Sequence, residues 1–391
     1  MSKFSLPLNT AIQHVLNNCF IQVYCPGEDI GFPLLSGNPG IGKTTGLEFT
    51  ARTKFDADVV RTYWALKPIE ELTGIPYFDD IVINGQKLER KGTKWSETDL
   101  MQVLQECAAK KKLENKMVLW VLDDIHFCDD IHMQYFHELL TEKKLKDSKI
   151  PDNVAIVLCG NHGDKKAGAN HFLSTVISRC QLMPAHSTFE DWKNNFAIRN
   201  NIHTSVLSFL NQDINKKYLN EEEQMDDPFG CSRTWSRLST TISKYEMWNN
   251  NSAIDIETIN YLAKGYISEE AANSFSTYYS VYSQFNCEEI LNNYNTFELP
   301  YDPITKYTML FALLAFYKNN YKEKNFIIAF SYIVYKYIKE DKPLGLIAMH
   351  DIIETEKILN KKGLYISVAM ELNKIEQNIT KEFIDDIKAI G

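Results

Sequence analysis

The stretch Gly37-Asn38-Pro39-Gly40-Ile41-Gly42-Lys43-Thr44 decides the fold expected for this sequence of 391 residues. It fits the pattern G-x-x-x-x-G-K-[ST] and lies between an apolar segment at 32–36 and a helix-forming segment at 43–52. Glycines allow consecutive backbone N–H groups to turn inward around phosphate oxygens, and a helix N-terminus attracts the same anions. The stretch therefore predicts a strand, a phosphate-binding loop and a helix, in that order.

The loop residues have distinct expected parts in binding a nucleotide. Lys43, which we expect in a solvent-facing loop, reaches the β and γ phosphates, and Thr44 holds Mg²⁺ through its hydroxyl. The expected phosphate contacts are Gly37, Asn38, Pro39, Gly40, Ile41, Gly42, Lys43, Thr44 and the adjacent Thr45. ATP and Mg²⁺ are therefore the expected cofactors.

A second motif is an apolar run at 117–122 that ends in Asp123 and Asp124. Such a run is typical of a central strand buried on both faces, and nucleotides bind where such strands end. Asp123 is expected to hold Mg²⁺, directly or through water, and Asp124 to orient the attacking water. Two acids after a strand often only cap a helix, so this prediction depends on the phosphate-binding loop upstream.

Two weaker signals follow. The strand predicted at 154–159 ends in Gly160 and Asn161, which would put the Asn161 amide beside the γ phosphate, although Gly-Asn is also a common turn. The helix predicted at 173–179 ends in Arg179, and a surface arginine is the simpler interpretation of that residue from the residues alone.

The order of these motifs resembles the AAA+ family, and specifically its MoxR-type and dynein-related branch. The segments at 72–76, 160–162 and 168–170 are also similar to that branch, and the resemblance covers about 34–246. It implies that Asn161 is the sensor 1 residue and that Arg179 is the arginine finger entering a neighbour's nucleotide pocket. Arg233 would be the sensor 2 contact from a helical lid.

The segments at 191–192, 233–235 and 271–272 are similar to stand-alone ATPases of bacteriophages. One departure from the MoxR-type pattern concerns the second motif. That branch usually has Asp-Glu, where this sequence has Asp123-Asp124. A carboxylate that is one methylene shorter places water less well, so slow hydrolysis is an expected consequence, with binding unaffected.

The sequence predicts three domains. Residues 1–188 alternate apolar strands, including 58–63, with helical stretches, which indicates an α/β nucleotide-binding domain with a parallel sheet covered by helices. Asn-Gly within 81–88 predicts a hairpin. Residues 189–264 form the expected helical lid, and residues 265–391 a C-terminal helical domain whose many Tyr and Phe side chains pack its core.

Composition and charge exclude several classes of protein. The formal net charge of −9 argues against a protein that coats nucleic acid. The apolar runs at 307–316 and 326–335 are shorter than the roughly 20 residues that cross a bilayer. The first ten residues lack the pattern of a secretory signal. We therefore expect no membrane association and a cytoplasmic protein, in the host cytoplasm if the source is viral.

Three functional hypotheses remain. The first is an ATPase that assembles into a ring, most often of six subunits in this family, and remodels a protein partner, as MoxR-type proteins do with von Willebrand A partners. The second is a nucleic-acid motor or loader that grips its substrate through basic segments at 87–94 and 143–149. The third is a slowly hydrolysing, ATP-gated assembly switch.

Overall fold

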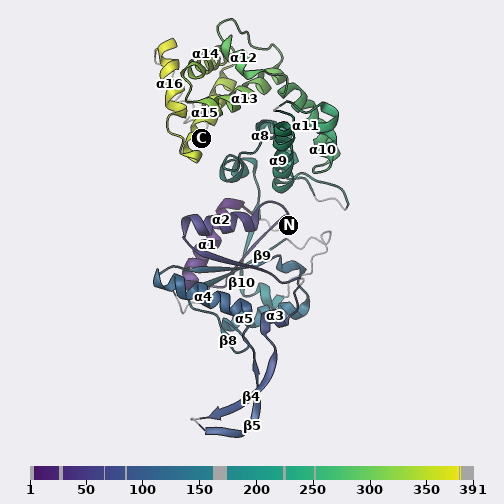
Figure 1. Cartoon of the computed structure of the whole chain (residues 1–391), viewed down its shortest axis with the longest axis vertical. Helices are drawn as coiled ribbons and strands as arrows, with labels where there is room; N and C mark the ends of the chain where they lie inside the picture. The colour runs from purple at the N-terminus through teal and green to yellow at the C-terminus, as the bar shows by residue number, and fades with distance from the viewer. Residues whose placement is uncertain are drawn as a thin grey trace. The chain divides into compact units, whose positions relative to one another are not determined.

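The chain folds into two compact units, Met1–Ser187 and Thr188–Gly391 (Figure 1). The computed structural model describes residues 4–25, 30–65, 67–83, 86–161, 174–222, 226–250, 252–377 and 379. The first unit is a parallel sheet with helices, and the second contains helices in its described residues. The predicted fold class, an α/β sheet followed by helices, is confirmed. The boundaries at 188/189 and 264/265 stay predictions.

A parallel sheet with strand order β1-β10-β2-β9-β6-β3 forms the centre of the first unit. Its strands are β1 (Leu6–Pro7), β2 (Phe32–Gly37), β3 (Asp58–Tyr63), β6 (Val118–Asp123), β9 (Val154–Gly160) and β10 (Cys180–His186). Every residue of β6 and β9 is buried. Their continuous apolar runs follow from burial on both faces, as the sequence predicted.

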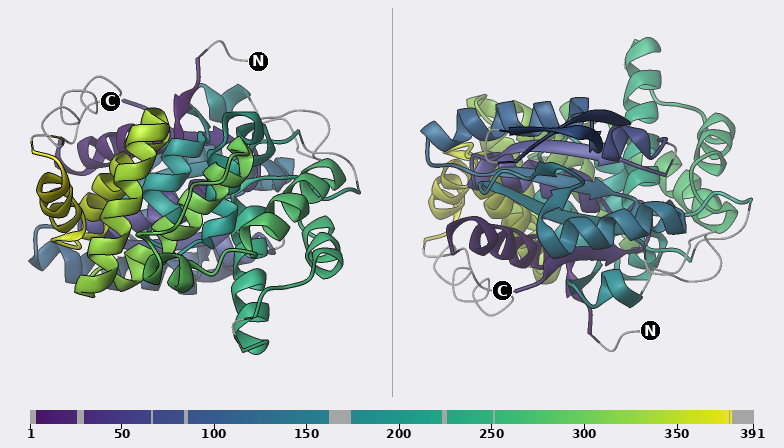
Figure 2. Two further views of the ribbon diagram at one scale, coloured as in Figure 1. Left: turned by 90° about the horizontal axis from the view of Figure 1, so that it is seen from above. Right: turned by 90° about the horizontal axis from the view of Figure 1, so that it is seen from below.

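Helices cover the two faces of this sheet (Figures 1 and 2). Successive strand side chains point to opposite faces, so Val121 packs with α1 (Leu8–Tyr24) and α2 (Lys43–Lys54). Trp120 packs in a separate core with α4 (Asp99–Leu113) and α5 (Asp130–Glu142). The strand residues therefore divide between two hydrophobic clusters.

The structure adds elements that the sequence analysis did not predict. Helix α1 packs beside β2, and β10 lies between β1 and β2 in the sheet. The helix predicted at 173–179 is shorter, since α6 spans Ser174–Ile177 and Arg179 stands in the turn before β10. The part of that prediction at 173 lies outside the described residues.

The predicted hairpin is confirmed and is longer than expected. Strands β4 (Pro76–Ile83) and β5 (Gln86–Trp95) pair antiparallel and extend away from the sheet (Figure 1). Gly74, with φ of +80°, ends α3 (Glu70–Thr73) just before the hairpin. A Cβ on Gly74 would lie 1.9 Å from the Ser96 carbonyl oxygen, so only glycine fits there. A second, small hairpin pairs β7 (Lys144–Leu145) with β8 (Ser148–Lys149).

The second unit contains two hydrophobic clusters. The first joins α7 (Phe189–Trp192) and η2 (Lys193–Ala197) to α8 (Thr204–Asn211), η3 (Asp213–Leu219), α9 (Ser232–Trp248), α10 (Ile256–Lys264) and α11 (Glu269–Tyr282). The second lies among α12 (Cys287–Asn292), α13 (Pro303–Asn320), α14 (Lys324–Glu340), α15 (Lys342–Leu359) and α16 (Leu364–Ile375). Among the residues described, no helix has both the length and the apolar character needed to cross a membrane.

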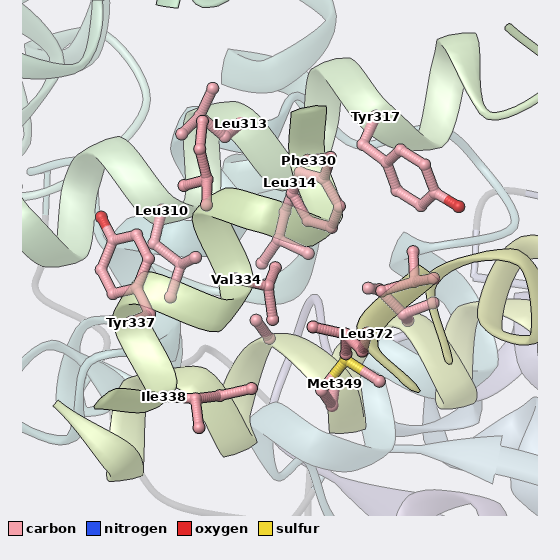
Figure 3. Close-up of a cluster of buried hydrophobic side chains, with 14 of the residues drawn as sticks. Leu310, Leu313, Leu314, Tyr317, Phe330, Val334, Tyr337, Ile338, Met349 and Leu372 are labelled. Atoms are coloured by element: carbon pink, nitrogen blue, oxygen red, sulfur yellow. The ribbon is translucent and has the colours of Figure 1, made fainter. Parts of the chain in front are cut away.

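Aromatic side chains pack the second cluster, as the sequence predicted (Figure 3). Tyr317 stacks on Phe330 with ring centroids 4.4 Å apart, and its hydroxyl donates to the Leu364 carbonyl at 2.8 Å. The Tyr337 hydroxyl donates to the Lys306 carbonyl at 2.8 Å. These tyrosines therefore supply apolar area while keeping their hydroxyl groups bonded.

A buried ion triad also ties this unit together. The Asp351 carboxylate on α15 pairs with Lys193 of η2 at 2.8 Å and with Lys318 of α13. Burial alone would raise the pKa of Asp351, but the ammonium groups of Lys318 and Lys193 outweigh it and hold that pKa well below its usual range. Removing the carboxylate would leave two desolvated cations facing each other.

Asp351→Asn is expected to lower the free energy of unfolding of the second unit by about 3 kcal/mol at neutral pH, because a broken buried ion pair leaves uncompensated charge. The folded pKa is depressed. The contribution is therefore fully present above the unfolded pKa of about 3.9 and declines as pH falls toward the folded pKa. Denaturant titrations across pH measure both. Glu371→Gln, which removes an exposed pair with Lys374, should cost under about 1 kcal/mol.

Candidate nucleotide-binding site

The loop at 37–44 has the backbone conformation that phosphate binding requires. Gly37 ends β2, and Gly42 caps the first turn of α2 in the left-handed conformation, with φ of +96°. Gly40 has φ of +77°. Glycine adopts such angles without steric cost, so both positions require it. The loop thus passes over the N-terminus of a twelve-residue helix, whose dipole favours anions.

Lys43 lies inside this loop and is only 7% exposed. Its Nζ donates to the carbonyl oxygens of Gly37 and Asn38, both at 2.9 Å, and to Asn161 Oδ1 at 2.8 Å. We expected Lys43 in a solvent-facing loop; Asn38 of the loop is exposed, but the Lys43 side chain is buried. Burial of an ammonium group requires such acceptors, and the loop carbonyls supply them.

Thr44 and Asp123 meet at the end of β6. The Thr44 hydroxyl donates to Asp123 Oδ1 at 2.8 Å, and the Asp123 side chain is buried. Both groups present oxygen atoms, which are the ligands that Mg²⁺ prefers. The pair that the sequence assigned to Mg²⁺ is therefore brought together, with a donor set that fits the ion.

Asp124 differs in conformation from its neighbour. It has φ of +51° and ψ of +38° and begins the short helix η1 (Ile125–Phe127). This left-handed conformation, uncommon for residues other than glycine and most frequent among them for Asn, Asp and His, turns the chain sharply after the strand. Asp124 is half-buried, whereas Asp123 is buried. The two carboxylates therefore stand in different environments, as their separate expected roles require.

Asn161 follows β9 and is 7% exposed. Its side chain accepts from Lys43, and its backbone N–H donates to His126 Nδ1 at 3.2 Å. Burial, with the nearby Lys43 charge, lowers the pKa of His126 to about 4. The imidazole is neutral at pH 7, with Nδ1 as an acceptor. The sequence analysis missed this role of His126, whose signal was its position two residues after Asp124.

Arg61 on β3 is a second residue that sequence reasoning missed. Its Nη2 lies 2.6 Å from Asp123 Oδ2, and its Nη1 lies 3.6 Å from Glu48 Oε1 on α2. Strand β3 pairs with β6, which puts Arg61 next to Val121 in register. A charged residue inside an apolar strand segment was the sequence signal for it.

The remaining loop residues lie as follows. Ile41 is buried, and its side chain joins the core beneath the loop, so its expected phosphate contact can come only from its backbone. Asn38 is exposed, Pro39 is half-buried, and Thr45 is exposed on the first turn of α2.

Arg179 lies at the end of the sheet where the strands begin, whereas the loop lies where β2 ends. It precedes Cys180, which pairs with Phe32 at the start of β2, whereas the loop follows Gly37. The five residue steps from Phe32 to Gly37 separate the two ends of β2 by about 17 Å. Arg179 Nε donates to Thr141 Oγ1 at 2.7 Å. Arg179 therefore cannot reach the loop of its own chain by a change of rotamer.

Arg233 lies in the second unit, exposed on the first turn of α9. The turn is fixed by Cys231 and Thr234, since Cys231 N donates to Thr234 Oγ1 at 2.8 Å. Trp235 is buried next to it, with Nε1 bonded to the Tyr218 carbonyl at 2.7 Å. The helix thus presents Arg233 from a rigid position. Of the segments used for the resemblance, 162 and 168–170 lie outside the described residues.

The basic segments differ in how far their charges are engaged. Lys146 Nζ lies 4.6 Å from the centre of the Tyr135 ring and 5.3 Å from that of Trp95, and it pairs with Glu138. Lys144 pairs with Glu142. In the long hairpin, Lys94 pairs with Asp79, and Lys91 is exposed. The side chains of Lys87 and Arg90 lie outside the described residues.

The similarity of this chain to known proteins is weak. No protein-family model matches the sequence, and no curated protein matches it. Among solved structures, the chain is similar to a point mutant of RuvB from Thermotoga maritima, with 13% identity, 79% of this chain and 82% of that chain covered, and a TM-score of 0.37. It is also similar to PCH-2 of C. elegans, with 13% identity, 70% and 68% covered, and a TM-score of 0.30. The argument for function therefore depends on the residues of the site.

Lys43→Ala is expected to weaken ATP binding by at least about 100-fold, because it removes the ammonium group that meets the phosphates. It should also cost about 1–2 kcal/mol of stability, since buried Asn161 Oδ1 loses its donor. Calorimetric titration and denaturant unfolding measure the two effects. Lys54→Ala, at the exposed end of α2, is the control. Near-normal affinity in Lys43→Ala would contradict the assignment.

Proposed function

We propose that this chain is an ATP-hydrolysing AAA+ motor. The observation that carries the proposal is the meeting of Lys43, Thr44, Asp123 and Asn161 where β2, β6 and β9 end. These strands are neighbours in the sheet, and the groups come from segments that are distant in the sequence, with a separation of 118 residues between Lys43 and Asn161. A glycine-rich turn of purely structural use would not require this constellation.

The chain's own residues divide the work of phosphoryl transfer. When a nucleotide binds, the Lys43 ammonium group donates to phosphate oxygens in place of the Gly37 and Asn38 carbonyl oxygens. The Asn161 side chain continues to accept from Lys43 and holds the ammonium group in position. Mg²⁺, held by Thr44 and Asp123, would neutralise charge on the phosphates. Asp124 orients the attacking water. Asn161 contacts the γ phosphate, as the resemblance implies.

The position of Arg179 supports a ring. Because this residue lies about 17 Å from its own loop along the strand, it serves a phosphate only across an interface between subunits. Arg233 contributes from the helical unit as the sensor 2 contact. The resemblance favours six subunits. The working form would be a homo-oligomeric ring with each pocket completed by its neighbour.

A protein substrate fits the long hairpin better than a nucleic acid does. Its strand β4 exposes Tyr77 and Phe78, which are 46% and 77% exposed, and Ile75 just before it is 62% exposed. Exposed apolar groups mark protein contacts. Of the hairpin cations whose side chains are described, Lys94 is paired with Asp79 and Lys91 is exposed. The proposed role is remodelling of a protein partner, with a von Willebrand A protein as one candidate. ATPase stimulation by a co-purifying protein supports this role, and stimulation by DNA supports a motor or loader.

The slow assembly switch is supported by Asp124 alone, because its carboxylate is one methylene shorter than the usual Glu.

Asp124→Asn is expected to bind ATP normally and to turn over at least about 100-fold more slowly, since only the carboxylate that orients water is lost. Asp124→Glu should raise turnover if the short side chain limits the rate. Steady-state phosphate release measures the turnover of the wild type, Asp124→Asn and Asp124→Glu. Asp130→Asn is the exposed acidic control. Unchanged turnover in Asp124→Asn would show that another group positions the water.

Arg179→Ala is expected to bind ATP and to hydrolyse it about 10³-fold more slowly, because an arginine supplied in trans meets charge that develops in the transition state. Mixing Arg179→Ala with Lys43→Ala protein should restore part of the activity, since the second variant still offers an intact Arg179 to a neighbour. Arg52→Ala, which removes an arginine of α2 bonded to the Val59 carbonyl, is the control. Mixed oligomers, verified by native mass measurement, that remain inactive would refute the shared pocket.

A further inference from the structure

Both oxygens of the buried Asp123 carboxylate have partners within the chain. Oδ1 accepts from Thr44, and Oδ2 lies 2.6 Å from Arg61 Nη2. The Asp123 side chain is 3% exposed, so its charge requires a nearby cation when no metal is bound. Arg61 supplies that cation.

We propose that Arg61 is a positioning residue that stands in for Mg²⁺ on Asp123 and moves to Glu48 when Mg²⁺ enters. The proposal rests on the function proposed above, because it takes Thr44 and Asp123 as the magnesium pair. Arg61 itself contacts neither nucleotide nor reacting atoms in this mechanism. It acts by holding Asp123 in place and by setting the Mg²⁺ concentration at which the site loads.

Competition for Asp123 follows from geometry and charge. Oδ2 is one of the two carboxylate oxygens that Asp123 would offer to Mg²⁺, and the Arg61 guanidinium lies against it. A guanidinium 2.6 Å from that oxygen also repels the incoming divalent cation. The ion pair between Arg61 and Asp123 must therefore loosen as the metal binds.

Glu48 provides the second position for the guanidinium. It lies on α2, one helical turn after Thr44, and its Oε1 is 3.6 Å from Arg61 Nη1. Among the residues described, this buried oxygen has no hydrogen-bond partner. The Arg61 side chain is half-exposed, so it has room to shift toward Glu48. One arginine thus lies between two carboxylates, of which only one is a metal ligand.

Two variants shift the Mg²⁺ requirement in opposite directions. The measurement is ATP affinity by calorimetry as a function of free Mg²⁺. Arg61→Gln should lower the midpoint Mg²⁺ concentration about tenfold, because the competing cation is gone. Glu48→Gln should raise that midpoint several-fold, because Arg61 loses its alternative partner.

The same Arg61→Gln protein should bind ATP about tenfold more weakly in excess chelator, since unpaired Asp123 then repels the phosphates. General damage to the fold would weaken ATP binding with and without Mg²⁺. It cannot therefore explain a variant that needs less Mg²⁺ to bind ATP and binds ATP more weakly in chelator. Arg52→Gln, which removes a nearby arginine bonded to the Val59 carbonyl, should leave both values unchanged. A midpoint that stays at the wild-type value in Arg61→Gln, with normal affinity at saturating Mg²⁺, would overturn the proposal.

A nucleotide-free measurement separates this inference from the proposed function. The melting temperature of Arg61→Gln should fall in chelator and recover in millimolar Mg²⁺, while that of the wild type should be insensitive to Mg²⁺. If Mg²⁺ restores the melting temperature of Arg61→Gln but the protein binds no ATP, the role of Arg61 is supported and the proposed ATPase function is contradicted. A fall that Mg²⁺ does not reverse would overturn the role of Arg61, whether or not ATP binds.

Discussion

The constraint on which the site depends is the burial of one carboxylate at the end of a buried strand. Asp123 terminates β6, whose residues are all buried, so its charge must be met by groups from neighbouring elements. Thr44 supplies one from α2, and Arg61 supplies another from β3. Loop, strand and helix are thereby held in fixed relation. The position also suits a divalent cation, because the Asp123 carboxylate and the Thr44 hydroxyl both present oxygen atoms there.

Much of the first unit could be predicted because its signals are local. The loop at 37–44 specifies its own turn through glycines, and the apolar runs of β6 and β9 specify burial on both faces. Sheet order also places Thr44 and Asp123 together, since β2 and β6 flank β9. Strand β10 was missed because it is only partly buried and contains Pro184, so its sequence lacks an apolar run.

The side-chain partners could not be read from the sequence because they depend on register between distant segments. Arg61 meets Asp123 only because β3 pairs with β6, and His126 meets Asn161 only because η1 folds back toward β9. The burial of Lys43 is a similar case, since the loop closes on it through its own carbonyl groups. The residue types indicated nucleotide and metal binding. Which side chains form ion pairs and hydrogen bonds with one another depends on tertiary contacts between distant segments.

The long hairpin is fixed at its base by the segment that connects the two halves of the site. Trp95 N donates to Asp147 Oδ2 at 3.0 Å, and Lys146 packs over the Trp95 ring. Residues 146 and 147 lie in the chain between Asp124 and Asn161, which both face the nucleotide in the proposed mechanism. A shift of residues 146 and 147 would therefore move the base of the hairpin, and the displacement would grow along its length.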